Sequence, residues 1–296
     1  MTDAPVGIRT LACDDVAQGA RVALHVMYAS RGGPLRERLG RYDVDVVRDG
    51  EIVGDAIPVV VISHGQGGTP WGYRGLALAL ARAGFAAVLL EHPGDRLGDA
   101  ALAGSRAMLV HRPRHVCLAL DAVYAQAALA PRLAPWTAIV GHSMGGYVAL
   151  ACAGGRAIAL PNQTAHGVAE PIEVHREPRV RAAVLLAPAL PWLMAPGALA
   201  DVDIPLYVRT GELDDQTPPF FVEKVLAGLP RTTRLDYAVV PRAGHFAFFT
   251  PFPPALVSPA IPPSLDPPGF DRAEYHAQLY PEIIAFLSSE RERELG

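Results

Sequence analysis

The sequence predicts an α/β fold built on a mostly parallel sheet with helices on both of its faces. Continuous apolar runs rich in β-branched residues alternate with Ala/Leu-rich amphipathic runs along most of the chain. Repeated β-α units imply right-handed crossovers, and such crossovers place helices on both faces of the sheet. The 296 residues can bury a large core, so we expect one domain over residues 1–296, although length alone also permits two smaller domains.

The first elements are expected at one edge of the sheet. Residues 6–15 and 20–30 have strand patterns, and Gln18-Gly19 between them predicts a turn and an antiparallel pair. Residues 57–63 form a continuous apolar run, which is typical of a strand buried on both faces. Beyond this run we expect helix 71–84, strand 85–90, helix 109–130, strand 136–141 and helix 144–154.

The same alternation continues toward the end of the chain. Residues 160–178 are polar and punctuated by proline, which indicates a surface loop. Residues 251–270 are dense in proline, which excludes a helix or a central strand. Because only one helix follows them, we expect a proline-rich surface loop near the active site rather than a linker. The remaining elements are expected as strands 180–188, 204–211 and 235–240 and helices 220–229 and 271–287.

Composition excludes several classes of protein. Half of the residues are hydrophobic and 19% are charged, which excludes a disordered chain, and the net charge of -4 gives no basis for nucleic-acid or anionic-membrane binding. Three cysteines without a C-x-x-C spacing indicate reduced thiols, and we expect a cytoplasmic protein. The N-terminal residues lack the pattern of a signal peptide, and no apolar stretch approaches the ~20 residues that span a bilayer.

Polar and glycine-rich segments follow several of the predicted strands. In an open parallel sheet, ligands bind beside the carboxyl ends of the strands, so these segments are expected to lie together where the strands end. In chain order they are HGQGG (64–68), EHPGDR (91–96), GHSMGG (141–146), GELDDQTP (211–218) and PRAGHFAF (241–248).

The third segment contains a G-x-S-x-G pattern centred on Ser143. Alone, the pattern is weak evidence in a glycine-rich chain, where a serine can simply occupy a bend. Between a buried strand and a helix of small residues, however, it is typical of a nucleophilic serine raised on a strained strand-to-helix turn. The Met144 amide would then lie at a helix N-terminus, where it can stabilise an oxyanion, and the Gln66 amide is expected as the second donor.

An acid and a base follow this serine in the order that such a fold requires. A serine hydroxyl is a weak nucleophile until a base removes its proton, and an acid must orient that base. His245 is the candidate base and Asp214 the candidate acid; Asp215 competes with Asp214, which is favoured as the first carboxylate after the turn.

The other histidines, and the carboxylates of the second segment, are expected to have structural roles. His64 and His142 precede or adjoin the serine and are interpreted as hydrogen-bond donors, and Glu91 and Asp95 as loop-stabilising residues. His111 and His115 have a spacing that suits two metal ligands on a helix, but no third ligand is evident. We therefore expect neither a metal nor a cofactor.

These segments resemble the α/β-hydrolase superfamily. SHGQGG, GHSMGGYVAL, GELDDQTP and AGHFAFF are most similar to the dienelactone-hydrolase-like carboxylesterases and the related platelet-activating-factor acetylhydrolases, and the likeness runs over residues 6–287. It implies Ser143 as nucleophile, Asp214 as acid, His245 as base, and the Gln66 and Met144 amides as the oxyanion hole. Dienelactone hydrolases proper use cysteine as the nucleophile, so lactone specificity does not follow.

The resemblance implies a carboxylic-ester hydrolase with a small-molecule substrate. Residues 189–203 are too short for a large cap domain, so loops are expected to roof the pocket. The expected activity is cleavage of small or short-acyl esters through an acyl-enzyme. We expect no membrane anchor. The alternatives are action on amides or peptides, perhydrolysis, or ligand binding without catalysis, and the oligomeric state is left open. The candidate pocket residues are Trp71, Trp192, Met194 and Phe246.

Overall fold

The computed structural model describes residues 4–174 and 176–295. The strands are β1 Val6–Asp15, β2 Ala20–Ala29, β3 Leu35–Leu39, β4 Tyr42–Arg48, β5 Ile57–Ser63, β6 Ala86–Leu90, β7 Leu133–His142, β8 Ile158–Ala159, β9 Glu170–Pro171, β10 Val180–Leu186, β11 Leu206–Gly211 and β12 Leu235–Val240. The helices are α1 Arg74–Arg82, α2 Arg106–Ala125, α3 Met144–Cys152, α4 Pro219–Leu226 and α5 Arg272–Leu295.

Ten of the strands form one sheet in the order β12-β11-β10-β7-β5-β6-β2-β1-β4-β3. From β12 to β6 every neighbouring pair is parallel, which confirms the predicted mostly parallel sheet. Every residue of β5 and β6 is buried, because helices cover both faces of this part of the sheet. The carboxyl ends of the adjacent strands β10, β7 and β5 lie side by side, and we call this side of the sheet its carboxyl edge.

The N-terminal strands pair as predicted but do not form the sheet edge. β1 and β2 are antiparallel, with Val6 opposite Ala29 and Asp15 opposite Ala20. The hairpin β3–β4 pairs with β1 and forms the edge instead, so the predicted position of the first pair is wrong. The residues of β4 alternate between buried and exposed, because one face of this strand packs on the core and the other meets water.

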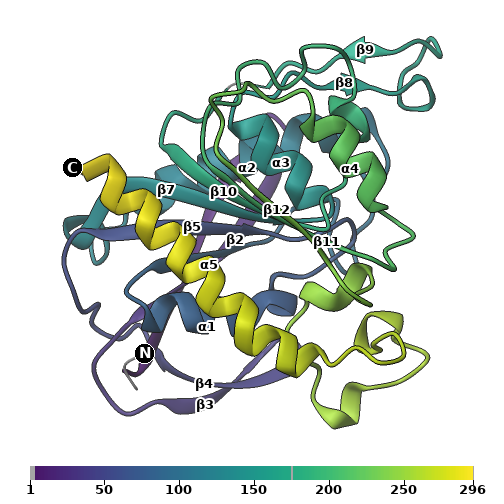
Figure 1. Cartoon of the computed structure of the whole chain (residues 1–296). Coiled ribbons are helices and arrows are strands. Elements are labelled where there is room, and N and C mark those ends of the chain that lie inside the picture. Colours follow the sequence, from purple (N-terminus) through teal and green to yellow (C-terminus); the bar gives the residue numbers. More distant parts are fainter. Residues whose placement is uncertain (1–3, 175, 296) are drawn as a thin grey trace.

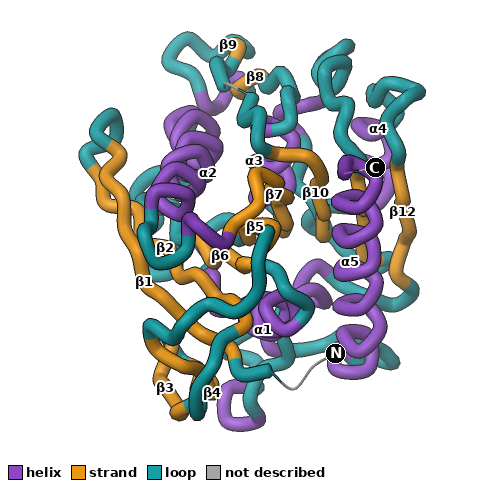
Figure 2. The backbone as a smooth tube through the Cα atoms, turned by 90° about the vertical axis from the view of Figure 1, so that its left-hand side faces the viewer, coloured by secondary structure: helices purple, strands orange, loops and turns teal. Residues whose placement is uncertain are grey.

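Two hydrophobic cores lie on opposite faces of the sheet. Consecutive residues of β5 supply both, since Val59 and Val61 belong to one core and Val60 and Ile62 to the other. Helices α2, α3 and α4 pack on the first core, and α1 and α5 on the second. Figures 1 and 2 show these two helix layers with the sheet between them.

A proline inside α2 produces a hydrogen bond between helices. Pro113 has no N–H, so the carbonyl of Leu109 four residues earlier has no helical donor. The hydroxyl of Tyr147 in α3 donates to that carbonyl at 2.9 Å. The helix begins after Ser105, whose hydroxyl accepts from the N–H of Met108 at 3.2 Å, and it ends at residue 125, five residues before the predicted end.

The proline-dense residues 251–270 form neither a regular helix nor a strand of the sheet. They contain two short 3₁₀ turns, Pro254–Leu256 and Pro262–Ser264. Arginine side chains fasten this segment to the body of the protein: Arg74 donates to the carbonyl of Pro251 at 2.5 Å, and Arg272 donates to that of Pro263 at 2.8 Å. In Figure 1 the segment lies beside the first turn of α5.

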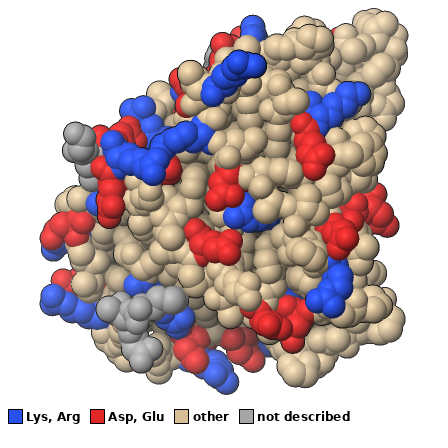
Figure 3. All heavy atoms as spheres, viewed as in Figure 1, with Lys and Arg blue, Asp and Glu red and all other residues tan. Residues whose placement is uncertain are grey.

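Charges on the surface are mixed in sign. On the face shown in Figure 3, acidic and basic side chains are interspersed, and neither gathers into a broad patch. No helix in residues 4–174 and 176–295 has both the length and the apolar composition needed to traverse a bilayer. All three cysteines are free thiols.

Tyr147→Phe is expected to lower the free energy of unfolding by about 1–3 kcal/mol, because it leaves the buried Leu109 carbonyl without a donor. Urea denaturation of the two proteins measures this difference. In a Pro113→Ala background the cost should shrink, since the new N–H at position 113 can donate to the same carbonyl. An equal cost in both backgrounds would contradict the assignment of this hydrogen bond.

Candidate active site

Ser143 lies between β7 and α3 with an unusual backbone conformation. Its φ of 52° and ψ of -116° are sparsely populated for residues other than glycine. Two neighbouring segments hold this conformation: its N–H donates to the Leu186 carbonyl at 3.0 Å, and its carbonyl accepts from the N–H of Ala189 at 2.8 Å. Its side chain is half-buried and stands at the carboxyl edge of the sheet, as expected for a serine raised on a turn.

Glycines flank Ser143 because the neighbouring backbone leaves no space for a side chain at positions 141 and 145. A Cβ atom on Gly141 would lie 2.1 Å from the Gly145 carbonyl oxygen, and one on Gly145 would lie 2.0 Å from the Ser63 carbonyl oxygen. Both distances are far below van der Waals contact, so no other residue fits without backbone movement. The G-x-S-x-G pattern therefore reflects a helix that begins directly against β5.

His245 and Asp214 meet at the same edge. Asp214 follows β11, and His245 opens a 3₁₀ turn after β12. The imidazole Nδ1–H donates to Oδ2 of Asp214 at 2.8 Å, which leaves Nε2 as the basic nitrogen. Both side chains are buried, whereas Asp215 is exposed. The structure thus brings the first of the two candidate carboxylates to His245.

Thr217 completes the surroundings of the Asp214 carboxylate and was missed by the sequence analysis. Its hydroxyl donates to Oδ2 of Asp214 at 2.7 Å, and its N–H donates to Oδ1 at 2.8 Å. Burial raises the pKa of Asp214, but the hydrogen bonds from His245 and Thr217 outweigh burial and hold the pKa below its ordinary value. The carboxylate is therefore ionised at neutral pH. The segment DDQTP (214–218) could have revealed this residue, because its threonine follows the candidate acid by three positions.

His142 supports His245 rather than competing with it. Its Nε2–H donates to the backbone carbonyl of His245 at 3.0 Å, and the two rings lie 4.9 Å apart. Burial, followed by the nearby His245 charge, lowers the pKa of His142 to about 3. The ring is neutral and donates a hydrogen bond, as the sequence analysis expected.

The two candidate oxyanion donors approach Ser143 from different elements. Met144 is the first residue of α3, and an N–H at this position has no acceptor within the helix. Gln66 lies in the turn after β5, which is close to Ser143, since a Cβ atom on Gly65 would be 3.2 Å from the Ser143 Cβ. A helix N-terminus and a turn amide are the kind of donors that stabilise a tetrahedral oxyanion.

A buried ion pair fastens the turn that carries Gln66. Asp95 accepts from the N–H of Gly67 at 2.8 Å, on one side of Gln66, and Arg112 donates to the His64 carbonyl on the other. Arg112 and Asp95 are joined at 3.0 Å, and each side chain is only 1% exposed. Asp95 thus has the loop-stabilising position expected of it. Arg112 was missed, because a single arginine on a helix carries no distinctive signal.

A chain of hydrogen-bonded histidines runs beneath the same turn. The Nε2–H of His115 donates to Oε1 of Gln18 at 2.6 Å, so its Nδ1 accepts from Nδ1–H of His92 at 3.1 Å. His92 Nε2 then accepts from the Ser63 hydroxyl at 2.9 Å. Both nitrogens of His115 are engaged. Within residues 4–174 and 176–295, no group of three side chains suited to a metal ion occurs.

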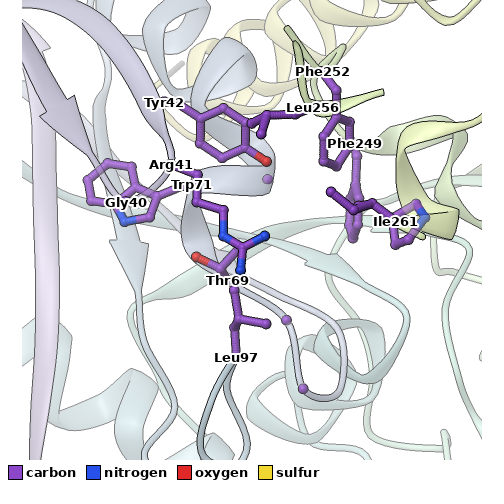
Figure 4. A pocket seen from close by; sticks show the side chains of 14 residues that line it. Gly40, Arg41, Tyr42, Thr69, Trp71, Leu97, Phe249, Phe252, Leu256 and Ile261 are labelled. Atoms are coloured by element: carbon purple, nitrogen blue, oxygen red, sulfur yellow. The ribbon is translucent and has the colours of Figure 1, made fainter. Parts of the chain in front are cut away.

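Two apolar cavities flank the candidate centre. The first, of about 190 Å³, adjoins the turn of Gln66, and Trp71 lines it (Figure 4). We call it the oxyanion-side cavity; it is lined by Gly40, Arg41, Tyr42, Gly67, Gly68, Thr69, Trp71, Gly72, Leu97, Phe249, Phe252, Leu256, Ile261 and Pro263. The second, of about 230 Å³, contacts Thr217, and Met194 lines it. We call it the acid-side cavity; its lining is Pro188 to Pro191, Met194, Gln216 to Pro218, Phe221, Val222 and Val225.

The other two candidate pocket residues line neither cavity. Trp192 is turned into the core by the 3₁₀ turn Pro191–Leu193, where it packs edge-on against Tyr147 and donates to Gln163 at 2.7 Å. Phe246 packs between His245 and Phe249, with ring distances of 5.3 and 5.5 Å. Its ring therefore packs directly against the imidazole of the candidate base.

The sequence is similar to one family of hydrolases. A family model described as "Serine aminopeptidase, S33" matches residues 54–200, a span that includes Ser143 and stops before Asp214 and His245. A search of curated protein sequences gave no match.

Solved structures of low sequence identity share the fold. A ferulic acid esterase from Streptomyces cinnamoneus has a TM-score of 0.73 and 18% identity, over 96% of this chain and 89% of that chain. A dienelactone hydrolase-like promiscuous phosphotriesterase from metagenomic libraries has a TM-score of 0.59 and 19% identity, over 95% of this chain and 98% of that chain. The chain thus has the α/β-hydrolase fold, as its motifs implied.

Asp95→Ala is expected to lower the free energy of unfolding by about 3–5 kcal/mol, because it leaves the Arg112 charge buried without a partner. Thermal or urea denaturation measures this loss. The double variant Asp95→Ala/Arg112→Leu should be more stable than Asp95→Ala alone, since it removes that charge as well. A double variant less stable than the single one would contradict this explanation.

Stability is expected to fall as the pH falls below 6.5. Burial lowers the pKa of His64, His115 and His142 from 6.5 to about 3, and that of His92 well below 6.5. Below pH 6.5 the unfolded chain therefore binds protons that the folded chain does not, and each such histidine contributes a slope of about 1.4 kcal/mol per pH unit. Urea denaturation between pH 7 and 5 measures the slope, and a flat profile would contradict the prediction.

Proposed function

We propose that this α/β-hydrolase is a serine hydrolase that cleaves carboxylic esters, with Ser143 as nucleophile, His245 as base and Asp214 as acid. The observation that carries the proposal is the 2.8 Å hydrogen bond between His245 and Asp214 at the sheet edge where Ser143 stands on its left-handed turn. Along the chain, the serine is followed by the aspartate and then by the histidine, which is the order that this fold requires.

The three side chains and the two amides divide the steps of the proposed reaction, and His245 transfers the proton in each of them. His245 Nε2 removes the Ser143 hydroxyl proton as Oγ attacks the ester carbonyl carbon, and Asp214 stabilises the imidazolium that forms. The N–H groups of Gln66 and Met144 bind the oxyanion. The intermediate collapses to an acyl-enzyme as His245 gives the proton to the departing alcohol. Water, deprotonated by His245, then attacks the acyl group and releases the carboxylic acid and the free serine.

The two cavities support a substrate with an apolar group on each side of its ester bond. An aminopeptidase substrate carries an α-ammonium group beside the scissile bond, and a carboxylate is the usual partner of such a group. The residues lining the two cavities include no aspartate or glutamate. We therefore favour esters over peptides as substrates, although the matching family is described as serine aminopeptidases.

We also propose that the enzyme acts on small molecules in the cytoplasm. The small size of both cavities supports small or short-acyl substrates, and three free thiols suit a reducing compartment. Perhydrolysis would use the same residues, with hydrogen peroxide in place of water as the attacking group.

Ser143→Ala is expected to lower kcat for 4-nitrophenyl acetate by about 10⁴-fold or more, with an unchanged circular dichroism spectrum. A fluorophosphonate probe should label the parent protein at Ser143 and leave the variant unlabelled. A matched anilide should be cleaved with a lower kcat/KM than the ester.

Asp215→Asn is the matched control, since this exposed carboxylate is the neighbour of the proposed acid. It should retain nearly all activity, while Asp214→Asn should lose most of it. Undiminished hydrolysis by Ser143→Ala, or labelling of another residue, would refute the mechanism. Ligand binding without labelling would indicate a non-catalytic protein, and faster cleavage of the anilide would refute the preference for esters.

A further inference from the structure

The oxyanion-side cavity has the size and lining of a site for an aromatic ring. Four rings face it, those of Tyr42, Trp71, Phe249 and Phe252 (Figure 4). Its volume of about 190 Å³ is sufficient for a substituted benzene ring, since an apolar cavity of about 150 Å³ holds benzene. Flat rings pack on such walls in offset or edge-on arrangements.

This cavity adjoins the proposed catalytic centre directly. Gly67 and Gly68 line it, and they follow Gln66 in the same turn. On the opposite wall, the Phe249 ring lies 5.1 Å from the His142 ring and 5.5 Å from the Phe246 ring, which in turn packs on His245. A group held in the cavity would therefore lie beside the turn that carries Gln66.

Arg41 lies at the tip of the β3–β4 hairpin, where the backbone is tightly fixed. Leu39 pairs with Tyr42, so Gly40 and Arg41 alone form the turn. Gly40 has a φ of 59°, and a Cβ atom there would lie 2.6 Å from the Trp71 ring. Tyr42 is held by the guanidinium of Arg74, which lies 3.7 Å from its ring centre. The hairpin tip is thus clamped on both sides of Arg41.

The guanidinium of Arg41 points into the cavity and is available for a ligand. In Figure 4 it extends from the hairpin toward Thr69 and Leu97 on the far wall. The two arginines of β3 are neutralised within the hairpin, Arg36 by Asp45 and Arg38 by Asp43. Arg41 has no ion pair or hydrogen bond to its guanidinium within the described part of the chain, and it is the one charged side chain among the cavity residues.

We propose that Arg41 and the oxyanion-side cavity form a subsite for an aromatic group that carries a carboxylate. The preferred substrates are then esters in which the aromatic acid part or the phenol part also carries a free carboxylate. This inference rests on the proposed function and narrows its substrate class. The rings bind the apolar body of the group, and the planar guanidinium binds the carboxylate through two parallel hydrogen bonds. Arg41 determines specificity and takes no part in the bond-breaking steps.

The test compares a charged substrate with a neutral one of nearly the same shape. The pair 4-carboxyphenyl acetate and 4-carbamoylphenyl acetate places the aromatic ring on the leaving group. The monomethyl ester of terephthalic acid and methyl 4-carbamoylbenzoate place it on the acyl group. The measured quantity is the kcat/KM for the carboxylate substrate divided by the kcat/KM for the matching amide. In at least one pair, Arg41→Gln should lower this ratio by about tenfold, and the ratio for Arg41→Lys should lie between those of Arg41→Gln and the parent protein.

Arg38→Gln is the matched control, because it removes one positive charge from the same hairpin outside the cavity. It should leave the ratio unchanged. An equal fall in Arg38→Gln would attribute the effect to net charge and overturn the proposal, as would an unchanged ratio in Arg41→Gln for both pairs.

A binding measurement separates this proposal from the proposed function. Calorimetry with the Ser143→Ala protein compares the binding of 4-hydroxybenzoate with that of 4-hydroxybenzamide. The proposal expects 4-hydroxybenzoate to bind more tightly, and it expects this difference to disappear in Ser143→Ala/Arg41→Gln. Such a result supports the subsite even where no ester is hydrolysed. Equal binding of the two compounds, together with ester hydrolysis by the parent protein, would overturn the subsite and leave the hydrolase intact.

Discussion

The left-handed backbone at Ser143 is the constraint on which the rest of the candidate site depends. A non-glycine residue in such a conformation costs about 1–3 kcal/mol and persists only where its surroundings enforce it. Here the enforcement comes from both neighbouring strands: β10 accepts the Ser143 N–H through Leu186, and β5 leaves room for Gly145 only without a side chain. The strand order β10-β7-β5 is therefore a requirement of the turn, because each neighbour supplies one side of it.

The same crowded edge explains why polar groups around the turn are buried and neutral. His64, His92, His115 and His142 are all excluded from water, and burial lowers the pKa of each. Neutral rings can donate hydrogen bonds to carbonyls of the turn without adding charge beside the candidate oxyanion donors. The Arg112–Asp95 pair is the exception, and its two charges largely cancel. The site is thus nearly neutral apart from the Asp214 carboxylate.

Sequence patterns predicted the parts of the fold that are repeated and locally encoded. Most of the parallel strands are rich in apolar residues, and Ser143, Asp214 and His245 were found because each follows one of the parallel strands. Their catalytic roles remain proposals. The β3–β4 hairpin was missed, since its strands are short, charged and exposed on one face. Arg112 and the inward turn of Trp192 were also missed, because each depends on contacts between segments far apart in the chain.

The oxyanion-side cavity depends on one segment that the sequence analysis missed, the β3–β4 hairpin, and on one that it predicted, the proline-dense loop. The turn, the acid and the base are fixed by β-α units whose pattern is strong, whereas the oxyanion-side cavity is closed by the hairpin tip and by residues 249–263. Neither segment belongs to the run of parallel strands from β12 to β6. The hairpin lies at the other end of the sheet, where β4 pairs with β1, and residues 249–263 form a loop that Arg74 holds at the Pro251 carbonyl. Changes at the hairpin tip can therefore alter the cavity without disturbing the strained turn at Ser143. The residues proposed to select the substrate thus lie mostly on segments other than those that carry the proposed nucleophile, acid and base.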